Sequence, residues 1–157
     1  MAEHPDDFDS KKRNAPSSPD GTRSVSFRSL PLERPELRAL GTALGEVRIR
    51  AIVGLFYRRM AADVLVGFFF DGRNLDEIAD RQSAFLYRAM GLRESYTGLP
   101  PADAHRTLPP ILAGHFDRRL TLLEEVLSAE GLAPHQIATW IQFENAFRAG
   151  IMPNRIT

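Results

Sequence analysis

The chain has 157 residues, of which 43% are hydrophobic and 25% charged, and its 20 basic and 20 acidic side chains cancel. This length and composition are typical of one soluble globular domain, and the zero net charge favours neither nucleic acid nor an anionic membrane as a partner. Cysteine is absent, which excludes disulfides, iron–sulfur clusters, thiolate metal sites and cysteine nucleophiles. Because the N-terminus has no signal-peptide core and no apolar run is long enough to cross a bilayer, we expect a cytoplasmic protein.

Residues 1–34 differ in composition from the rest of the chain. They are rich in proline, serine and charge, and their apolar residues, such as Phe8 and Val25, are scattered. Such a segment cannot bury enough apolar surface to offset the entropy lost on ordering. We therefore expect a flexible N-terminal extension over 1–34, followed by one domain over 35–157. The basic patch Lys11-Lys12-Arg13 could contact an acidic partner, but the acidic residues before it favour a solvated arm.

Apolar residues recur at helical spacing through most of the domain. The expected helices run from Pro35 to about Gly45, over 46–62, 74–90 and 113–129, and from Pro134 onward. Asn74 is the expected N-cap of the third helix, and Gly91 and Gly131 are expected to follow helix ends. The apolar run 64–70 ends in an Asp-Gly turn signal and is interpreted as a tight buried corner, because no partner strand is evident. The fold class is therefore all-α.

Two polar side chains lie on inward helix faces. Tyr57 follows Val53 by one helical turn, so its hydroxyl is carried toward the interior, where a tyrosine hydroxyl normally needs a partner. Gln82 stands in the middle of the apolar stripe of the third helix. A buried amide without a partner would cost about 1–3 kcal/mol, so Gln82 is expected to bond either a group in the interior or a nearby backbone atom.

His105 lies on a very short segment between the pairs Pro100-Pro101 and Pro109-Pro110. Proline interrupts helices, so only about two turns fit between these pairs. His105 is either an axial metal ligand on this platform or an ordinary histidine of a capped loop. The other histidines show no zinc-ligand spacing.

Enzyme signatures are otherwise sparse. The sequence has no glycine-rich phosphate loop, no GxSxG motif and no HExxH pair. Glu124 and Glu125 are adjacent and diverge on a helix, which favours a solvated face over paired-carboxylate catalysis. A single histidine that faces polar donors inside an aromatic-rich interior suits a haem iron that binds a small gas.

Four groups of residues carry a resemblance to a known family. They are Gly45-Glu46 with Phe56-Tyr57 and Asp63, then Phe70, then Gln82-Ser83-Ala84-Phe85-Leu86, and finally Tyr96-Thr97-Gly98 followed by His105. In this order, the stretch from about Gly45 to Met152 resembles the truncated haemoglobins, the short two-on-two helical globins, and is most similar to group I. Leu108-Pro109-Pro110 is more like group III, and Arg119 stands where groups II and III usually have tryptophan.

The resemblance implies a truncated globin fold that encloses haem b, with His105 as the proximal iron ligand. Tyr57 and Gln82 would then form the catalytic distal pair. Ile78 would exclude other molecules from the distal side but could not donate a hydrogen bond. The resemblance places further cofactor contacts at the macrocycle and its propionates: Phe70, Phe85 and Leu86 against the ring, with Arg81 and Tyr96 near the propionates. Arg81 is equally explained as a solvated helix residue.

The function implied is binding of dioxygen, nitric oxide and carbon monoxide. Nitric oxide dioxygenation with an external reductase is the enzymatic possibility that the resemblance adds. One alternative is a haem-based gas or redox sensor, or an electron-transfer partner protein, in which the N-terminal extension contacts a partner. A more remote alternative is a helical interaction domain without haem. Neither a nucleic acid nor a membrane is expected as a partner.

Overall fold

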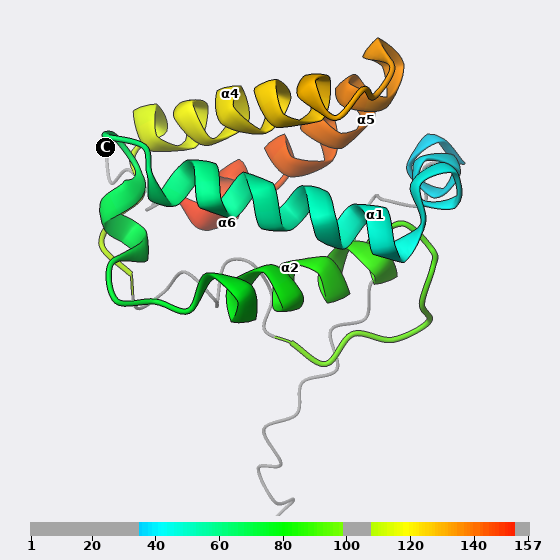
Figure 1. Cartoon of the computed structure of the whole chain (residues 1–157), viewed down its shortest axis with the longest axis horizontal. Helices are drawn as coiled ribbons and strands as arrows, with labels where there is room; N and C mark the ends of the chain where they lie inside the picture. The colour runs from blue at the N-terminus through cyan, green and yellow to red at the C-terminus, as the bar shows by residue number, and fades with distance from the viewer. Residues whose placement is uncertain (1–34, 99–107, 153–157) are drawn as a thin grey trace, which may run out of the picture.

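The structure is a computed structural model that describes residues 35–98 and 108–152. Within these ranges all regular elements are helical, which confirms the all-α prediction (Figure 1). The elements are the helices α1 (Pro35–Ala61), the 3₁₀ turn η2 (Gly67–Phe70), α2 (Leu75–Ala89), α4 (Ala113–Ala129), α5 (Pro134–Asn145) and α6 (Arg148–Ile151). Helix α1 packs on α2, α4 and α5, and α4 packs on α5. In Figure 1, α1 lies between α4 and α2, so the pairs α1–α2 and α4–α5 form the two-on-two sandwich.

Helix α1 consists of two limbs that meet at Gly45, where φ is 74° and ψ is 164°. The sequence predicted a helix end at this position. On the first limb, Leu37 and Leu40 are buried in the core. The backbone of Gly41 lies so close to α2 that an added Cβ would be only 2.6 Å from the Cβ of Met90. This close approach holds the first limb against the end of α2.

Glu46, directly after the break, is tied to the C-terminal part of α2. The hydroxyl of Tyr87 donates to the Glu46 carbonyl oxygen at 3.0 Å, and Arg93 Nε donates to Glu46 Oε1 at 2.7 Å. The Arg93 guanidinium also stacks over the Tyr87 ring. These bonds fix the angle between the limbs by linking the second limb to α2.

Helix α2 begins and ends as predicted. The side chain of Asn74 accepts a hydrogen bond from the Glu77 backbone N–H at 3.1 Å, which satisfies one of the free donors of the first turn. Gly91, with φ 77°, follows the helix in a left-handed conformation that glycine adopts without steric cost. These two signals set the bounds of α2, which packs on α1.

The corner between α1 and α2 is only partly buried, so the prediction of a buried corner was wrong for Val64, Leu65 and Phe68. Val64 is 95% and Phe68 47% exposed, whereas Val66 and Phe69 are buried. A 3₁₀ turn places residues i and i+3 on one side, so Val66 and Phe69 share an inner face while Phe68 points outward. Asp63 fixes the corner, because its Oδ1 accepts from the Leu65 N–H at 2.9 Å.

Helix α4 has the predicted bounds, and Pro134 begins α5 as predicted. The buried residues of α4 are Phe116, Leu122, Leu123, Val126 and Leu127, while Leu120 is half-buried. In α5, Phe143 packs against Phe85 and Phe147. None of the described helices has the length and apolar character needed to cross a membrane.

Candidate functional site

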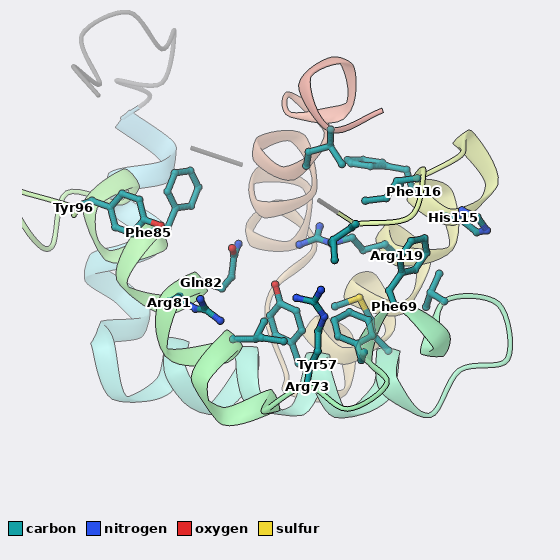
Figure 2. A pocket seen from close by; sticks show the side chains of 17 residues that line it. Tyr57, Phe69, Arg73, Arg81, Gln82, Phe85, Tyr96, His115, Phe116 and Arg119 are labelled. Atoms are coloured by element: carbon teal, nitrogen blue, oxygen red, sulfur yellow. The ribbon is translucent and has the colours of Figure 1, made fainter. Parts of the chain in front are cut away.

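A cavity of about 270 Å³ lies inside the fold (Figure 2). Interiors of proteins rarely contain voids larger than a water molecule, so a space of this size leaves room for a ligand. Side chains from α1, the corner, α2 and the segment after it, the segment before α4, α4 and α6 line it: Tyr57, Met60, Val66, Phe69, Phe70, Arg73, Ile78, Arg81, Gln82, Phe85, Tyr96, Leu108, Ile111, His115, Phe116, Arg119 and Ile151.

Aromatic rings form much of the wall of the cavity. Phe70 meets the Tyr57 ring edge-on, with centroids 5.8 Å apart. Phe85 packs in the same way against Tyr96, at 5.4 Å, and against Phe147, at 5.6 Å. Edge-to-face packing locks these rings against each other. The wall is therefore apolar and firmly held, which suits a flat aromatic ligand.

Tyr57 and Gln82 bring hydrogen-bond donors into this apolar space from two different helices, α1 and α2. Figure 2 shows the Tyr57 hydroxyl and the Gln82 amide directed into the cavity. The Tyr57 side chain is buried, and burial raises the pKa of its phenol, so the hydroxyl stays protonated and can donate at neutral pH. Across residues 35–98 and 108–152, Gln82 makes no side-chain hydrogen bond to the backbone, which leaves its amide available to a ligand.

Cationic side chains stand at the exposed side of the cavity. Arg73 and Arg81 both line it and are both exposed, and Tyr96 lines it half-buried. Ile78 contributes an apolar side chain next to them. This combination of an apolar interior, inward donors and exposed guanidinium groups fits haem, a flat macrocycle that carries two carboxylates.

Leu86 is not brought to the cavity. It is fully buried, at 0% exposure, in the core between the helices, and it is absent from the residues that form the wall. The reason is its angular position on α2, because the face that carries Ile78, Gln82 and Phe85 is the one turned toward the cavity. Of the nine predicted site residues, those in the described ranges converge on the cavity except Leu86, and His105 lies outside the described residues.

His115 is a second histidine at the cavity, and its hydrogen bonding decides what it can do. Its Nδ1 accepts from the Leu112 backbone N–H at 3.1 Å, and its ring meets the edge of Phe69 at 5.2 Å. Because a backbone N–H can only donate, Nδ1 carries the lone pair, and the proton of the neutral ring is on Nε2. Nε2 then has no lone pair for a metal. In this arrangement the His115 ring caps the first turn of α4 and is not poised as a metal ligand, and the described residues hold no cluster of three acidic or histidine side chains that could hold an ion.

The sequence did not predict a buried ion pair beside the cavity. Arg119 Nη1 donates to Glu144 Oε2 at 2.6 Å, and Trp140 Nε1 donates to Glu144 Oε1 at 3.4 Å. The Arg119 and Glu144 side chains are 19% and 7% exposed. Burial alone would lower the pKa of Arg119, but the Glu144 carboxylate and the Tyr57 hydroxyl together outweigh it, and the pKa is raised. A signal existed, because Glu144 follows Trp140 by one turn on the inward face of α5, where an acidic side chain needs a partner.

Three comparisons with known proteins agree with this architecture. A family model described as bacterial-like globin matches residues 40–152. A group 1 truncated hemoglobin of Chlamydomonas moewusii is 32% identical over 95 residues, which cover 60% of this chain and 56% of that protein. A group 1 truncated hemoglobin of Tetrahymena thermophila is 30% identical over 89 residues, which cover 57% of this chain and 73% of that protein. The crystal structure of the truncated hemoglobin from Tetrahymena pyriformis in the Fe(III) form superposes with a TM-score of 0.67 at 26% identity and covers 73% of this chain and 98% of that chain.

Proposed function

This chain belongs to the bacterial-like globin family, and from that premise we propose that its cavity holds haem b and binds diatomic gases between Tyr57 and Gln82. Membership implies a haem cofactor and small gaseous ligands such as dioxygen. The gas-binding site is supported by two inward hydrogen-bond donors in an aromatic-walled cavity of about 270 Å³. When bound, haem supplies the iron atom that the ligand and His105 share.

His105 is proposed as the iron ligand because of its place in the Tyr96-Thr97-Gly98…His105 motif. A histidine that binds a metal through one ring nitrogen usually donates from the other to a carbonyl or water, which fixes its tautomer. The geometry of His115 supports this assignment indirectly, since its Nδ1 is occupied by the start of α4.

Tyr57 and Gln82 would hold the diatomic ligand. A haem iron would polarise its diatomic ligand, and the Tyr57 hydroxyl and the Gln82 amide, as donors in an apolar site, would stabilise partial negative charge on that ligand more than the same donors in water. The phenol of Tyr57 remains protonated because burial raises its pKa. Ile78 would narrow the site and exclude water, but it could not donate a hydrogen bond.

Nitric oxide dioxygenation is the reaction that we propose for this site. Nitrate forms from one molecule each of dioxygen and nitric oxide plus one electron, and an external reductase must resupply that electron. Tyr57 and Gln82 would slow the escape of dioxygen until nitric oxide arrives. Carbon monoxide would bind as a third diatomic ligand.

The decisive measurement is the absorption spectrum of purified protein in its ferric, ferrous and carbon monoxide-treated forms. Wild type should show a Soret band that moves on addition of carbon monoxide. In His105→Ala this band should be lost or altered, and in His115→Ala it should be retained. A wild type without a Soret band would overturn the proposal, and a normal spectrum in His105→Ala would overturn the ligand assignment.

The donor pair is tested by the dissociation rate of dioxygen. In the variant Tyr57→Phe with Gln82→Leu this rate should rise by about tenfold or more, because each lost bond is worth roughly 1 kcal/mol. Ile78→Val serves as the matched control, since it changes the same pocket without touching a donor. An unchanged rate in the double variant would show that neither side chain donates to the ligand.

A further inference from the structure

The described lining of the cavity is cationic. It includes Arg73, Arg81 and Arg119, and within residues 35–98 and 108–152 it includes no aspartate or glutamate. Arg73 and Arg81 are exposed and can meet the two carboxylates of haem at the surface. Arg119 is different, because its side chain is only 19% exposed and lies on α4. Arg119 is therefore a cationic group inside the cavity that the two haem carboxylates do not require.

Arg119 is held in place by a carboxylate and by an aromatic ring. Its Nη1 donates to Glu144, and its Cζ lies over the Phe56 ring, 5.1 Å from the centroid. A guanidinium group has five N–H donors in a fixed plane, so the bond to Glu144 leaves others for the cavity. Burial raises the pKa of the Tyr57 phenol, and among the charged side chains around it Arg119 opposes this rise most. Figure 2 shows Arg119 extending toward the space beside Tyr57.

We propose that Arg119 raises the affinity of this site for small anionic ligands of ferric haem, such as azide and nitrite, beside the gases that it binds in the ferrous state. The inference rests on the proposed haem function and adds the class of ligand. Arg119 lines the cavity whereas its partner Glu144 does not, so a ligand in the cavity should interact more strongly with the positive charge than with the negative one. Charge-assisted hydrogen bonds are about twice as strong as neutral ones. Glu144 lowers the strength of this effect and fixes the position of Arg119.

The two halves of the ion pair should have opposite effects on anion affinity, and this separates the proposal from general damage to the fold. Glu144→Gln removes the negative charge and leaves Arg119 uncompensated, so azide and nitrite should bind several times more tightly to the ferric protein. Arg119→Gln combined with Glu144→Gln removes both charges and leaves two amides that can bond each other. In this double variant the anions should bind about tenfold more weakly than in wild type.

The experiment is a titration of ferric wild type, Glu144→Gln and the double variant with azide, nitrite and neutral imidazole, followed by the absorption spectrum. Imidazole affinity should change little among the three proteins. If the anion affinities are equal in all three, or follow the imidazole affinity, the inference is overturned while a normal Soret band leaves the haem function standing. If wild type shows no Soret band, the haem function fails and the inference fails with it.

Discussion

A single backbone conformation at Gly45 divides α1 into two limbs. Its φ of 74° and ψ of 164° lie in a region that residues with a Cβ rarely occupy. In Gly45→Ala we expect the free energy of unfolding to fall by about 1–3 kcal/mol, the usual cost of such a strained residue. Urea denaturation of the two proteins measures this difference.

Gly114→Ala is the matched control for that experiment. Gly114 lies inside α4, and a Cβ there would meet no atom within 4 Å. Alanine favours a helix over glycine, so this variant should be as stable as wild type or slightly more stable. Equal stability of Gly45→Ala and Gly114→Ala would show that the break in α1 carries no strain.

Side-chain roles could be predicted from the sequence where local periodicity determines them. Tyr57 and Gln82 lie on the apolar stripes of their own helices, so their inward direction follows from spacing alone. Arg119 and Glu144 could not be paired in this way, because their helices meet only in the folded chain. An arginine on a helix is usually solvated, and only the packing of α4 on α5 buries this one. Leu86 was misplaced because its stripe serves the core as well as the cavity.

At the scale of elements, α2 depends on its first turn. The Asn74 side chain accepts from the Glu77 N–H at 3.1 Å, and α2 carries Ile78, Gln82 and Phe85. Asn74→Ala should lower the free energy of unfolding by about 1 kcal/mol, because one donor of the first turn loses its partner. Asn74→Asp keeps an acceptor at the same place and should stay close to wild type. If both variants lose stability equally in thermal melts, the capping bond does not account for the effect.

Helix bounds were more predictable than the corner between helices. The bounds of α2, α4 and the start of α5 follow from an N-cap residue, glycines that can take positive φ, and a proline in the first turn, all of which act locally. The corner at 64–70 is apolar throughout, so its sequence does not indicate which residues face inward. The 3₁₀ turn decides this, and it depends on the carboxylate of Asp63 and on the close contact of Gly67 with Ala61.

At the scale of the whole molecule, Asp63 joins the end of α1 to α4. Its Oδ2 accepts from Arg118 Nε at 3.0 Å and Nη2 at 2.8 Å, and its side chain is 6% exposed. The hydrogen bond from Arg118 lowers the pKa of Asp63, with the backbone N–H groups of Leu65 and Val66 adding to the effect. The folded chain therefore binds this proton less readily than the unfolded chain. The resulting stability is fully present above the unfolded pKa of about 3.9 and is lost as the pH falls through the lower folded value.

Replacing Arg118 should therefore reduce the acid sensitivity of the fold. Arg118→Gln should be less stable than wild type at about pH 7, and the difference should shrink toward about pH 3, where Asp63 begins to take up its proton. Urea denaturation of both proteins between these two pH values measures the difference in the free energy of unfolding. The control is Arg59→Gln, because its partner Glu125 is 47% exposed and water screens such pairs. A stability difference for Arg118→Gln that does not vary with pH would contradict the assignment.

The cavity also separates two parts of the sandwich. Helix α2 packs mostly on α1, whereas α4 packs on α1 and α5, and the side chains that α2 and α4 turn toward each other meet at the cavity. A haem in this space would join the two walls, so its binding free energy would count toward the attachment of α2. Opening of α2 in the haem-free protein would expose apolar side chains and backbone to proteases. The supply of haem in the cell would then set the lifetime of the chain as well as its activity.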